Sequence, residues 1–381
     1  MSTNRFYPPS GLRESNPTKV DGLLAGLHLD LPLLTGLILL SLFGLLVLFS
    51  ASGESIEHVK RALLRLALAF AMMVVVAQIP PTVVRRWSPR LFAISLMLLV
   101  AVLVAGHGAK GAQRWISLGF FNFQPADLAK LAVPMMIAWF LAEKPLPPTW
   151  QRLTIAGAMI FVPILLIALQ PDLGTALLVA SSGLFVLFLA GLSWRFLAGM
   201  AITAVPSGWV LWEWGMHDYQ RGRVLTFLDP ERDPLGSGYH IIQSKIAIGS
   251  GGLYGKGWLN GTQSHLEFLP ERTTDFIFAV LSEEFGLTGV ILLLSLYLLI
   301  ILRGLYIATR AQDTFSRLLA GALTLVFFVY LFVNTGMVSG LLPVVGVPLP
   351  LVSYGGTATV TILTGFGILM SIHTHRKLLP T

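Results

Sequence analysis

The sequence has no cysteine and few charged residues. The absence of cysteine from all 381 residues excludes disulfide bonds and cysteine-ligated metal sites. Only 12% of the residues are charged, whereas soluble domains carry roughly 25%. Hydrophobic residues make up 55% of the chain, and the mean hydropathy is +0.75. These values exclude a water-soluble globular protein and indicate a membrane protein.

The apolar residues gather into ten runs that are candidate membrane spans. A spanning helix needs about 20 apolar residues, so ten helices use about 200 residues and leave no room for a soluble domain of ordinary size. We therefore predict an all-α integral membrane protein with about ten transmembrane helices. The runs cover residues 31–51, 61–79, 91–106, 124–142, 153–170, 172–191, 196–215, 275–302, 316–340 and 350–372.

The chain is predicted to divide into a short leader and one membrane domain. Residues 1–30 are polar and proline-containing, which predicts a disordered cytoplasmic leader. The first apolar run begins too late, and is too long, for a cleaved signal peptide. Residues 31–381 then form a single polytopic membrane domain, whose longest connection, about 216–274, is predicted to be periplasmic.

Basic residues in the short connections set the orientation of a membrane protein. Most of them fall on the side of the N-terminus, and the short connections on the other side hold Lys60, Arg61, Lys110 and Arg114. Both termini are therefore predicted to be cytoplasmic. Because this topology accounts for most of the net charge of +7, no nucleic-acid partner is expected.

One motif, at 265–286, combines a helix start with acidic residues and reads HLEFLPERTTDFIFAVLSEEFG. Thr273 and Thr274 are candidate N-caps, which would place Asp275 in the first turn of the next helix. Asp275 then either complements the helix dipole or acts as a general base at the outer interface. Glu283 and Glu284 lie deeper in the same apolar span, where a structural ion pair or a protonated state is favoured.

A second motif, at 111–130, reads GAQRWISLGFFNFQPADLAK. Arg114 beside Trp115 suits an anionic headgroup attached to a sugar, although Trp115 also suits an aromatic belt. Asp127 and Lys130 are spaced i, i+3 and can pair on one helix face. That pair either holds helices together or presents Lys130 to a phosphate.

Two further segments are rich in helix breakers. QPDLGT, at 170–175, places Asp172 either at a cavity or in a simple turn. SGLLPVVGVPLPLVSYGG, at 339–356, predicts either a re-entrant segment lining a polar groove or a plain loop. A glycine-rich run at 249–257 matches neither the P-loop nor the dinucleotide fingerprint.

Together these segments resemble the SEDS family (shape, elongation, division and sporulation), whose members include RodA and FtsW. The resemblance covers nearly the whole chain from about residue 30. Residues PER before TTDFIFAV, and the short tails, are more similar to RodA, the elongation member. The motifs that carry it are GAQRWISLG, FQPADLAK, QPDLGT, YQRGRVLTFLDPERDPLGSGYHIIQSKIAIGSGGLYGKG, PERTTDFIFAVLSEEFG and NTGMVSGLLPVVGVPLPLVSYGG.

This resemblance implies a peptidoglycan glycosyltransferase of the bacterial inner membrane. Such an enzyme polymerises lipid II at the outer membrane face during cell elongation, by inverting attack of a sugar hydroxyl with release of undecaprenyl pyrophosphate. It works with a class B penicillin-binding protein. The family's essential Asp matches Asp275, and the conserved Trp of its RWI motif matches Trp115. Asp127 departs from the family pattern, which usually has Glu there.

We predict that Asp275 is the catalytic base. Asp127 and Lys130 are expected to form a supporting ion pair. A divalent cation (Mg or Mn) is an open option as cofactor, and the identity of any metal is unknown. Lipid II, the penicillin-binding protein and membrane lipids are the expected partners. The predicted substrate-binding residues are Arg114, Trp115, Lys130, Asp172, Arg221, Arg223 and Arg272.

Two other functions are compatible with the residues. A lipid II flippase needs a polar path through the bundle, which Asp127, Lys130, Glu283 and Glu284 could supply. A non-enzymatic scaffold would only activate the penicillin-binding protein, and Asp275 would then be dispensable. The clustering of charge toward the outer half and the polar 216–274 loop favour the enzyme.

Overall fold

A computed structural model describes most of the chain between residues 26 and 376. The described residues are 26–105, 107–109, 112–117, 122–192, 194–216, 218–229, 231, 237–265 and 271–376. The predicted leader therefore lies almost entirely outside them. Within the described residues, the regular secondary structure is helical apart from one small sheet.

Each of the ten predicted apolar runs contains a helix. Seven of these helices are long and apolar enough to cross a membrane, and α7 is a shorter apolar helix. The predicted all-α membrane fold is thereby confirmed. The helices are α2 (Leu31–Ala51), α3 (Ile56–Ala77), α4 (Pro81–Ala105), α5 (Pro125–Ala142), α6 (Trp150–Ala168), α7 (Leu173–Leu189), α8 (Trp194–Val210), α12 (Ile277–Thr309), α13 (Thr314–Val338) and α14 (Thr357–Thr374).

Among the helix starts, those of α4 and α14 differ most from the prediction. Helix α4 begins at Pro81, ten residues before the predicted apolar run, and so includes basic residues of the predicted inner connection. Arg90 lies over the Trp87 ring, 5.2 Å from its centroid, so a basic side chain is accommodated on the helix surface. The last helix begins at Thr357 rather than near 350, because the proline-rich chain before it cannot be helical.

Helix α2 illustrates why these segments are membrane helices. The Asp30 carboxylate caps it by accepting a hydrogen bond from Leu33 N at 3.0 Å. One face, which includes Leu33, Leu37 and Leu40, is buried, while other leucines of the same helix are exposed. A helix that is apolar on all sides satisfies its own backbone and exposes hydrocarbon to lipid.

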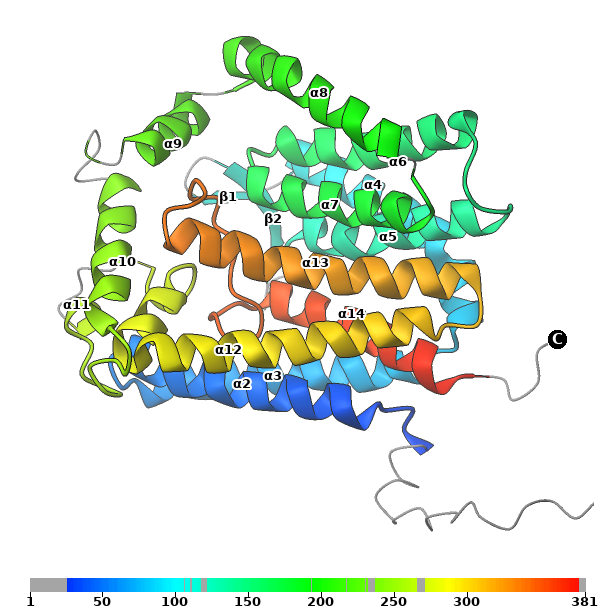
Figure 1. Ribbon diagram of the computed structural model, residues 1–381. Helices are drawn as coiled ribbons and strands as arrows, with labels where there is room; N and C mark the ends of the chain where they lie inside the picture. Colours follow the sequence, from blue (N-terminus) through cyan, green and yellow to red (C-terminus); the bar gives the residue numbers. More distant parts are fainter. Residues whose placement is uncertain are drawn as a thin grey trace, which may run out of the picture.

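Most of the long helices run side by side in one bundle, with α14 packed on α3 and α12 packed on α2 and α13 (Figure 1). One end of the bundle carries α9 (Asp218–Leu228), α10 (Ser237–Gly251) and α11 (Thr262–His265). We call this the loop end. The other end carries the start of α2 and the end of α14, and we call it the terminal end.

Side-chain contacts join three helices at the terminal end. Arg303 of α12 donates from Nε to Asp30 Oδ1 at 3.0 Å and from Nη2 to Asp30 Oδ2 at 2.6 Å. His373 of α14 places Nε2 3.3 Å from the same carboxylate. The rings of His28 and His375 stack with their centroids 3.8 Å apart. Burial and the neighbouring His375 lower the pKa of His28 below its usual value.

A small antiparallel sheet lies between α4 and α5. Its strands are β1 (His107–Ala109), β2 (Ala112–Ser117) and β3 (Asn122–Phe123), in the order β1-β2-β3. His107 pairs with Trp115, and Ile116 pairs with Phe123. Arg114 and Trp115, which lie in a connection between two predicted spans, are therefore held by strand pairing.

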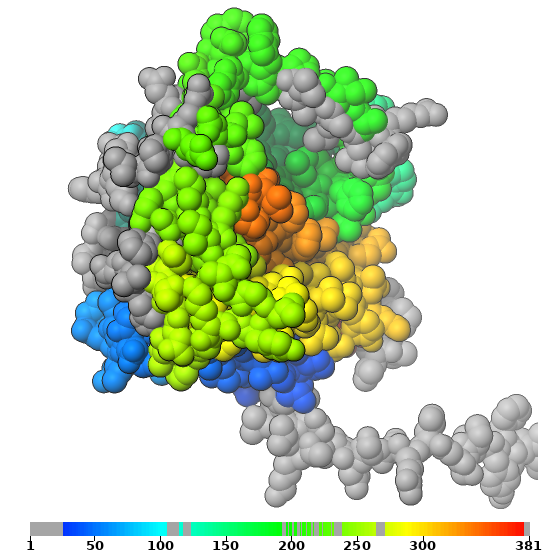
Figure 2. Space-filling model, turned by 60° about the vertical axis from the view of Figure 1, so that its left-hand side comes forward, coloured from blue at the N-terminus to red at the C-terminus, as the bar shows by residue number. Residues whose placement is uncertain are grey.

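The long 216–274 connection is largely helical where the structure describes it. A π-helical segment, η1 (Leu211–Gly215), extends α8 and leads toward α9. Figure 2 looks onto the loop end, where the yellow-green residues of α10 and the chain after it cover the bundle. Orange atoms of the α13–α14 connection reach the surface beside them.

Candidate functional site

Asp275 lies in a turn just before α12 and not within the helix. The helix begins at Ile277, and Phe276 occupies the N-cap position without a side-chain cap bond. The expectation that Thr273 or Thr274 caps the helix, with Asp275 in its first turn, is therefore wrong. The reason lies in tertiary contacts, which engage the carbonyl groups of this turn.

Three successive carbonyl groups of the turn accept hydrogen bonds from distant parts of the chain. They are Thr273 O from Tyr354 N (2.8 Å), Thr274 O from Ser353 Oγ (2.5 Å) and Asp275 O from Asn334 Nδ2 (2.9 Å). Asn334 is fully buried, and its Nδ2 also donates to Val347 O at 2.8 Å. The backbone around the candidate base is thus fixed by α13 and by the 339–356 segment.

The 339–356 segment enters the bundle. Val347, Leu349, Leu351 and Val352 are buried. The Tyr297 hydroxyl of α12 donates to the carbonyl of Pro350 at 2.5 Å, which satisfies one of its buried backbone groups. Irregular backbone is tolerated at membrane depth only where protein groups satisfy it in this way.

A second group of predicted residues gathers at the start of α7. Arg114 donates from Nε to Gln170 O at 3.4 Å and from Nη2 to Pro171 O. Its Nε also lies 3.9 Å from Asp172 Oδ2. Asp172 caps α7 through Thr175 N at 3.2 Å and accepts from Gln124 Nε2 at 2.9 Å, so its carboxylate joins the sheet, α5 and α7.

Two neighbouring residues of the 339–356 segment connect this group to Asp275. A Cβ atom at Gly174 would lie 2.6 Å from Val345 O, so the first turn of α7 packs directly on the segment. Gly346 has φ +72, and a Cβ atom there would lie 3.4 Å from Asp275 Oδ2. The Asp275 carboxylate therefore packs against Gly346, next to the residue that contacts α7.

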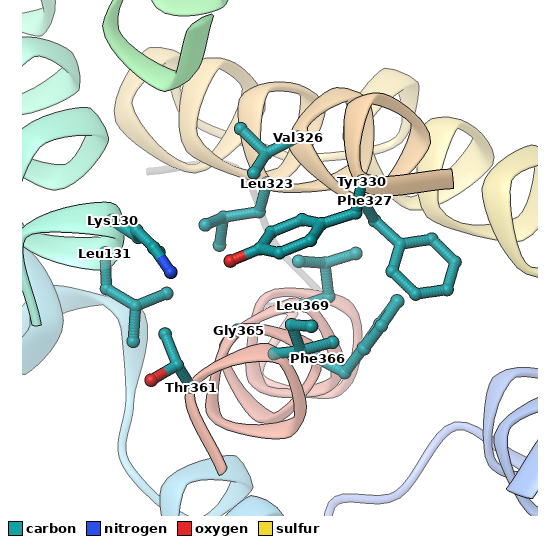
Figure 3. Close-up of a pocket in the computed structure, with 11 residues that line it drawn as sticks. Lys130, Leu131, Leu323, Val326, Phe327, Tyr330, Thr361, Gly365, Phe366 and Leu369 are labelled. Atoms are coloured by element: carbon teal, nitrogen blue, oxygen red, sulfur yellow. The ribbon is translucent and has the colours of Figure 1, made fainter. Parts of the chain in front are cut away.

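Asp127 and Lys130 form an ion pair inside the bundle. Lys130 Nζ lies 2.7 Å from Asp127 Oδ1, and both side chains are buried. Figure 3 shows the Lys130 amine pointing toward the Tyr330 hydroxyl in a cavity that Thr361 and Gly365 also line. Lys130 Nζ is 5.5 Å from the centroid of the Tyr330 ring. Its ammonium is directed at α13 within the protein.

The other predicted basic residues are more dispersed. Arg272 shares the turn with Asp275, and its Nη2 lies beside Gly53 in the α2–α3 connection, 3.9 Å from where a Cβ atom would be. Arg221 of α9 donates to Glu213 O at 2.9 Å and so holds η1 to α9. The side chain of Arg223 lies outside the described residues. Trp115 is partly buried in β2.

Asn334 and Tyr330 were not predicted as site residues. They lie four residues apart, on the same face of α13, so one face of this helix contacts both Lys130 and the Asp275 turn. The available signal was a polar amide within an apolar span, which is costly unless it is bonded. The sequence did not show which backbone groups it would bond.

In the part of the chain that the structure describes, no three His, Asp or Glu side chains gather in a way that could hold a metal ion. Mg²⁺ bound to a pyrophosphate needs only one or two protein carboxylates. A divalent cation carried by the substrate therefore stays a prediction, and its protein ligands are not assigned.

Comparisons with known proteins identify the family of this chain. The family described as cell cycle protein, of FtsW, RodA and SpoVE, matches residues 31–378. The peptidoglycan glycosyltransferase MrdB of Escherichia coli K12 is 60% identical over 92% of this chain and 95% of its own length. The probable peptidoglycan glycosyltransferase FtsW of Trichlorobacter lovleyi is 38% identical over 92% of this chain and 94% of its own.

Solved structures share the fold. A chain of a peptidoglycan synthase complex, in which polymerization and crosslinking are coordinated, has a TM-score of 0.80 and 32% identity, covering 92% of this chain and 99% of that one. The rod shape determining protein RodA of Thermus thermophilus has a TM-score of 0.70 and 28% identity, covering 92% of this chain and 98% of its own.

Proposed function

Since this chain belongs to the FtsW, RodA and SpoVE family of cell cycle proteins, we propose that it is a peptidoglycan glycosyltransferase that polymerises lipid II during cell elongation. The observation that carries the proposal is the Asp275 carboxylate, held in a turn whose carbonyl groups are bonded by α13 and the 339–356 segment. The identity of 60% with a RodA-type relative named for this activity supports the elongation role.

The loop end is proposed to face the outside of the cytoplasmic membrane, with both termini in the cytoplasm. The distribution of basic residues supports this orientation, because the short connections at the terminal end carry most of them. Asp275 then lies at the outer interface, at the level of a lipid-linked headgroup. Membrane lipids surround the exposed apolar faces of the bundle.

The proposed reaction is a single inverting displacement. The 4-hydroxyl of an acceptor sugar attacks the anomeric carbon of the donor, and the bond from that carbon to the pyrophosphate oxygen breaks. Asp275 accepts the hydroxyl proton, which makes the oxygen more nucleophilic. Undecaprenyl pyrophosphate leaves with the electron pair of the broken bond and needs cationic stabilisation.

Of the predicted basic residues, Arg272 and Arg114 are proposed to stabilise the leaving group. Arg272 shares the turn with Asp275, and Arg114 lies beside Asp172 at the start of α7. Lys130, which is buried against Tyr330, acts on the substrate only if the bundle opens toward it. Arg223 stays a prediction of the sequence, whereas the bond of Arg221 to Glu213 O favours a structural role.

A class B penicillin-binding protein is proposed as the partner that crosslinks the product. Support comes from the similarity of this chain to a component of a solved peptidoglycan synthase complex. In such a pair, polymerisation by this chain supplies the glycan strands that the transpeptidase then joins.

The test is glycan-chain formation from purified lipid II by this protein with its penicillin-binding partner, whose crosslinking site is blocked. Asp275→Asn and Asp275→Ala are expected to lower the rate by about 100-fold or more, as loss of a general base does. Asp313→Asn is the matched control, since Asp313 caps α13 at the terminal end and Asn keeps the cap. Full activity of Asp275→Asn would exclude the base role. Lipid flipping without polymerisation by the wild type would favour a flippase.

A further inference from the structure

Helix α12 is interrupted below the candidate base. Gly286 has φ 62 and ψ −158, which is not helical, so residues 277–285 and 287–309 form two helical parts. Asp275 precedes the first part directly. An interruption of this kind creates a pivot unless other groups hold the two parts in one geometry.

The chain after α10 supplies those groups through its backbone. In a continuous helix, the carbonyls of Glu283 and Glu284 would accept hydrogen bonds from the amides of Leu287 and Thr288. Here the loop amides of Lys256 and Gly257 bond these two carbonyls, each at 3.0 Å. The freed amides bond loop carbonyls instead, Leu287 N to Gly252 O at 3.0 Å and Thr288 N to Leu253 O at 3.1 Å. We call this arrangement, of residues 251–257 with 283–288, the helix junction.

Close backbone contact explains three glycines at the junction. A Cβ atom at Gly251 would lie 2.0 Å from Ser282 O, and one at Gly255 would lie 2.1 Å from Glu284 O. A Cβ atom at Gly286 would lie 2.3 Å from Gly255 N. No side chain fits at these distances, so the glycine-rich run is required by packing against α12.

An ion pair reinforces the junction. The fully buried Glu283 accepts from Lys256 Nζ at 2.7 Å, Thr262 Oγ1 at 3.0 Å and Gln263 N at 3.0 Å. Trp258 in the same loop donates from Nε1 to Leu46 O at 3.2 Å, which connects the junction to α2. Because Glu283 is fully buried, water cannot replace these donors to its carboxylate.

We infer that the helix junction positions Asp275 for catalysis, and that Gly251, Gly255, Lys256 and Glu283 are positioning residues that do not touch the substrate. The turn that carries Asp275 is held on one side by Asn334 and Ser353. On the other side of this turn, the junction holds the first helical part of α12, residues 277–285. This inference rests on the proposed role of Asp275.

The expected consequence is kinetic. A reacting group displaced by about 1 Å loses about 100-fold in rate, because proximity and orientation supply much of the rate enhancement. Substrate affinity is proposed to depend on Arg272 and Arg114, which are not among residues 251–257 and 283–288 of the junction. Damage to the junction should therefore lower kcat and leave KM for lipid II nearly unchanged.

A matched glycine pair tests this. Gly251→Ala introduces the Cβ atom that collides with Ser282 O, whereas a Cβ atom at Gly249, two residues earlier in α10, meets nothing within 4 Å. Gly251→Ala is expected to lower kcat by about 100-fold with KM within about twofold, while Gly249→Ala keeps both. The rates are normalised to folded protein, measured by monodisperse yield and melting temperature. A loss of folded protein with normal kcat per folded molecule would overturn the inference.

The ion pair provides a second test if Gly251→Ala does not fold. Lys256→Gln is expected to lower kcat by about tenfold, and Lys256→Arg to retain it, since Arg keeps the charge that Glu283 requires. Full kcat for Lys256→Gln would contradict the inference. Asp275→Asn is assayed in parallel. Full activity of that variant removes the proposed base role, whereas an inactive Asp275→Asn beside a fully active Gly251→Ala removes only the positioning role.

Discussion

The loop end and the terminal end of the bundle are held together in different ways. At the terminal end, side-chain contacts connect the ends of neighbouring helices. Asp30 caps α2 and also pairs with Arg303 of α12. At the loop end, backbone groups of interrupted segments bond to one another or to a buried amide, as Asn334 does with two carbonyls. A backbone bond fixes the main chain directly, whereas a long charged side chain permits some movement.

This difference separates a region suited to chemistry from one suited to anchoring. Catalytic groups must be held closely to a productive geometry, and supporting hydrogen bonds do this. The loop end has three such supports for the Asp275 turn: Asn334 of α13, the 339–356 segment and the helix junction. Changes at the loop end should therefore alter the rate per folded molecule. Changes at the terminal end should alter stability alone.

The largest effect is expected from breaking the buried pair of Asp127 and Lys130. Lys130→Met leaves the Asp127 carboxylate without its cation and should cost about 3–5 kcal/mol in the free energy of unfolding. Asp127→Glu retains the charge and should cost far less. Thermal melting of the purified protein in detergent measures both.

The double variant sharpens the comparison. Asp127→Asn combined with Lys130→Met removes both charges and should recover much of the stability lost in Lys130→Met. If polymerisation recovers in parallel, the pair is structural. If stability returns without activity, Lys130 acts on the substrate. A double variant as unstable as the single one would contradict the pairwise account.

A smaller effect is expected at the terminal end. Asp30→Asn keeps the cap on Leu33 N but loses the charged hydrogen bonds from Arg303, which are worth about 1.5–3 kcal/mol each in protected sites and less where Arg303 is partly exposed. The melting temperature should fall, while the rate of polymerisation per folded molecule stays at the wild-type value. A reduced kcat would show that the two ends are coupled.

The smallest effect is a pH dependence of the stacked histidines. The pKa of His28 is lowered from its ordinary 6.5, so the folded state favours the neutral ring. The neutral His28 ring contributes fully to stability above the pKa that His28 has in the unfolded chain. This contribution is lost as the pH falls from that value toward the lower pKa of His28 in the folded protein. Melting temperatures from about pH 7.5 to 5.5 should therefore fall more for the wild type than for His28→Gln. Equal slopes of melting temperature against pH for the two proteins would exclude the stack of His28 and His375 as the source of the pH dependence.

Sequence patterns predicted the helices well because membrane spans obey a local rule. Each needs a run of apolar residues, and both the run and its length are visible without knowledge of neighbours. The start of α12 was misplaced for the opposite reason. Thr273 and Thr274 have the composition of helix caps, but their carbonyls are engaged by Tyr354 and Ser353 from about 80 residues away along the chain.

The residues of the candidate site also divide into those that the sequence pattern predicted and those that it missed. Asp275, Arg114 and Asp172 are conspicuous because charges in or beside apolar spans are costly. The roles of the predicted substrate-binding residues stay predictions. Tyr330, Asn334 and Gly346 were missed, since their contacts with Lys130 and Asp275 depend on how α5, α13 and the 339–356 segment pack.

The sequence by itself determined that this is a multi-pass membrane protein of the RodA and FtsW family with an acidic residue at the start of its longest apolar run. Composition and ordered motifs are local properties of the chain, so no fold is needed to read them. Only the tertiary structure decided that the glycine-rich run enters an interruption of α12 and that the 339–356 segment bonds the Asp275 turn. The junction, and the bond from Tyr354 N to Thr273 O, pair backbone groups of distant segments. Backbone groups are the same in nearly every residue type, so the sequence carries little record of these pairings.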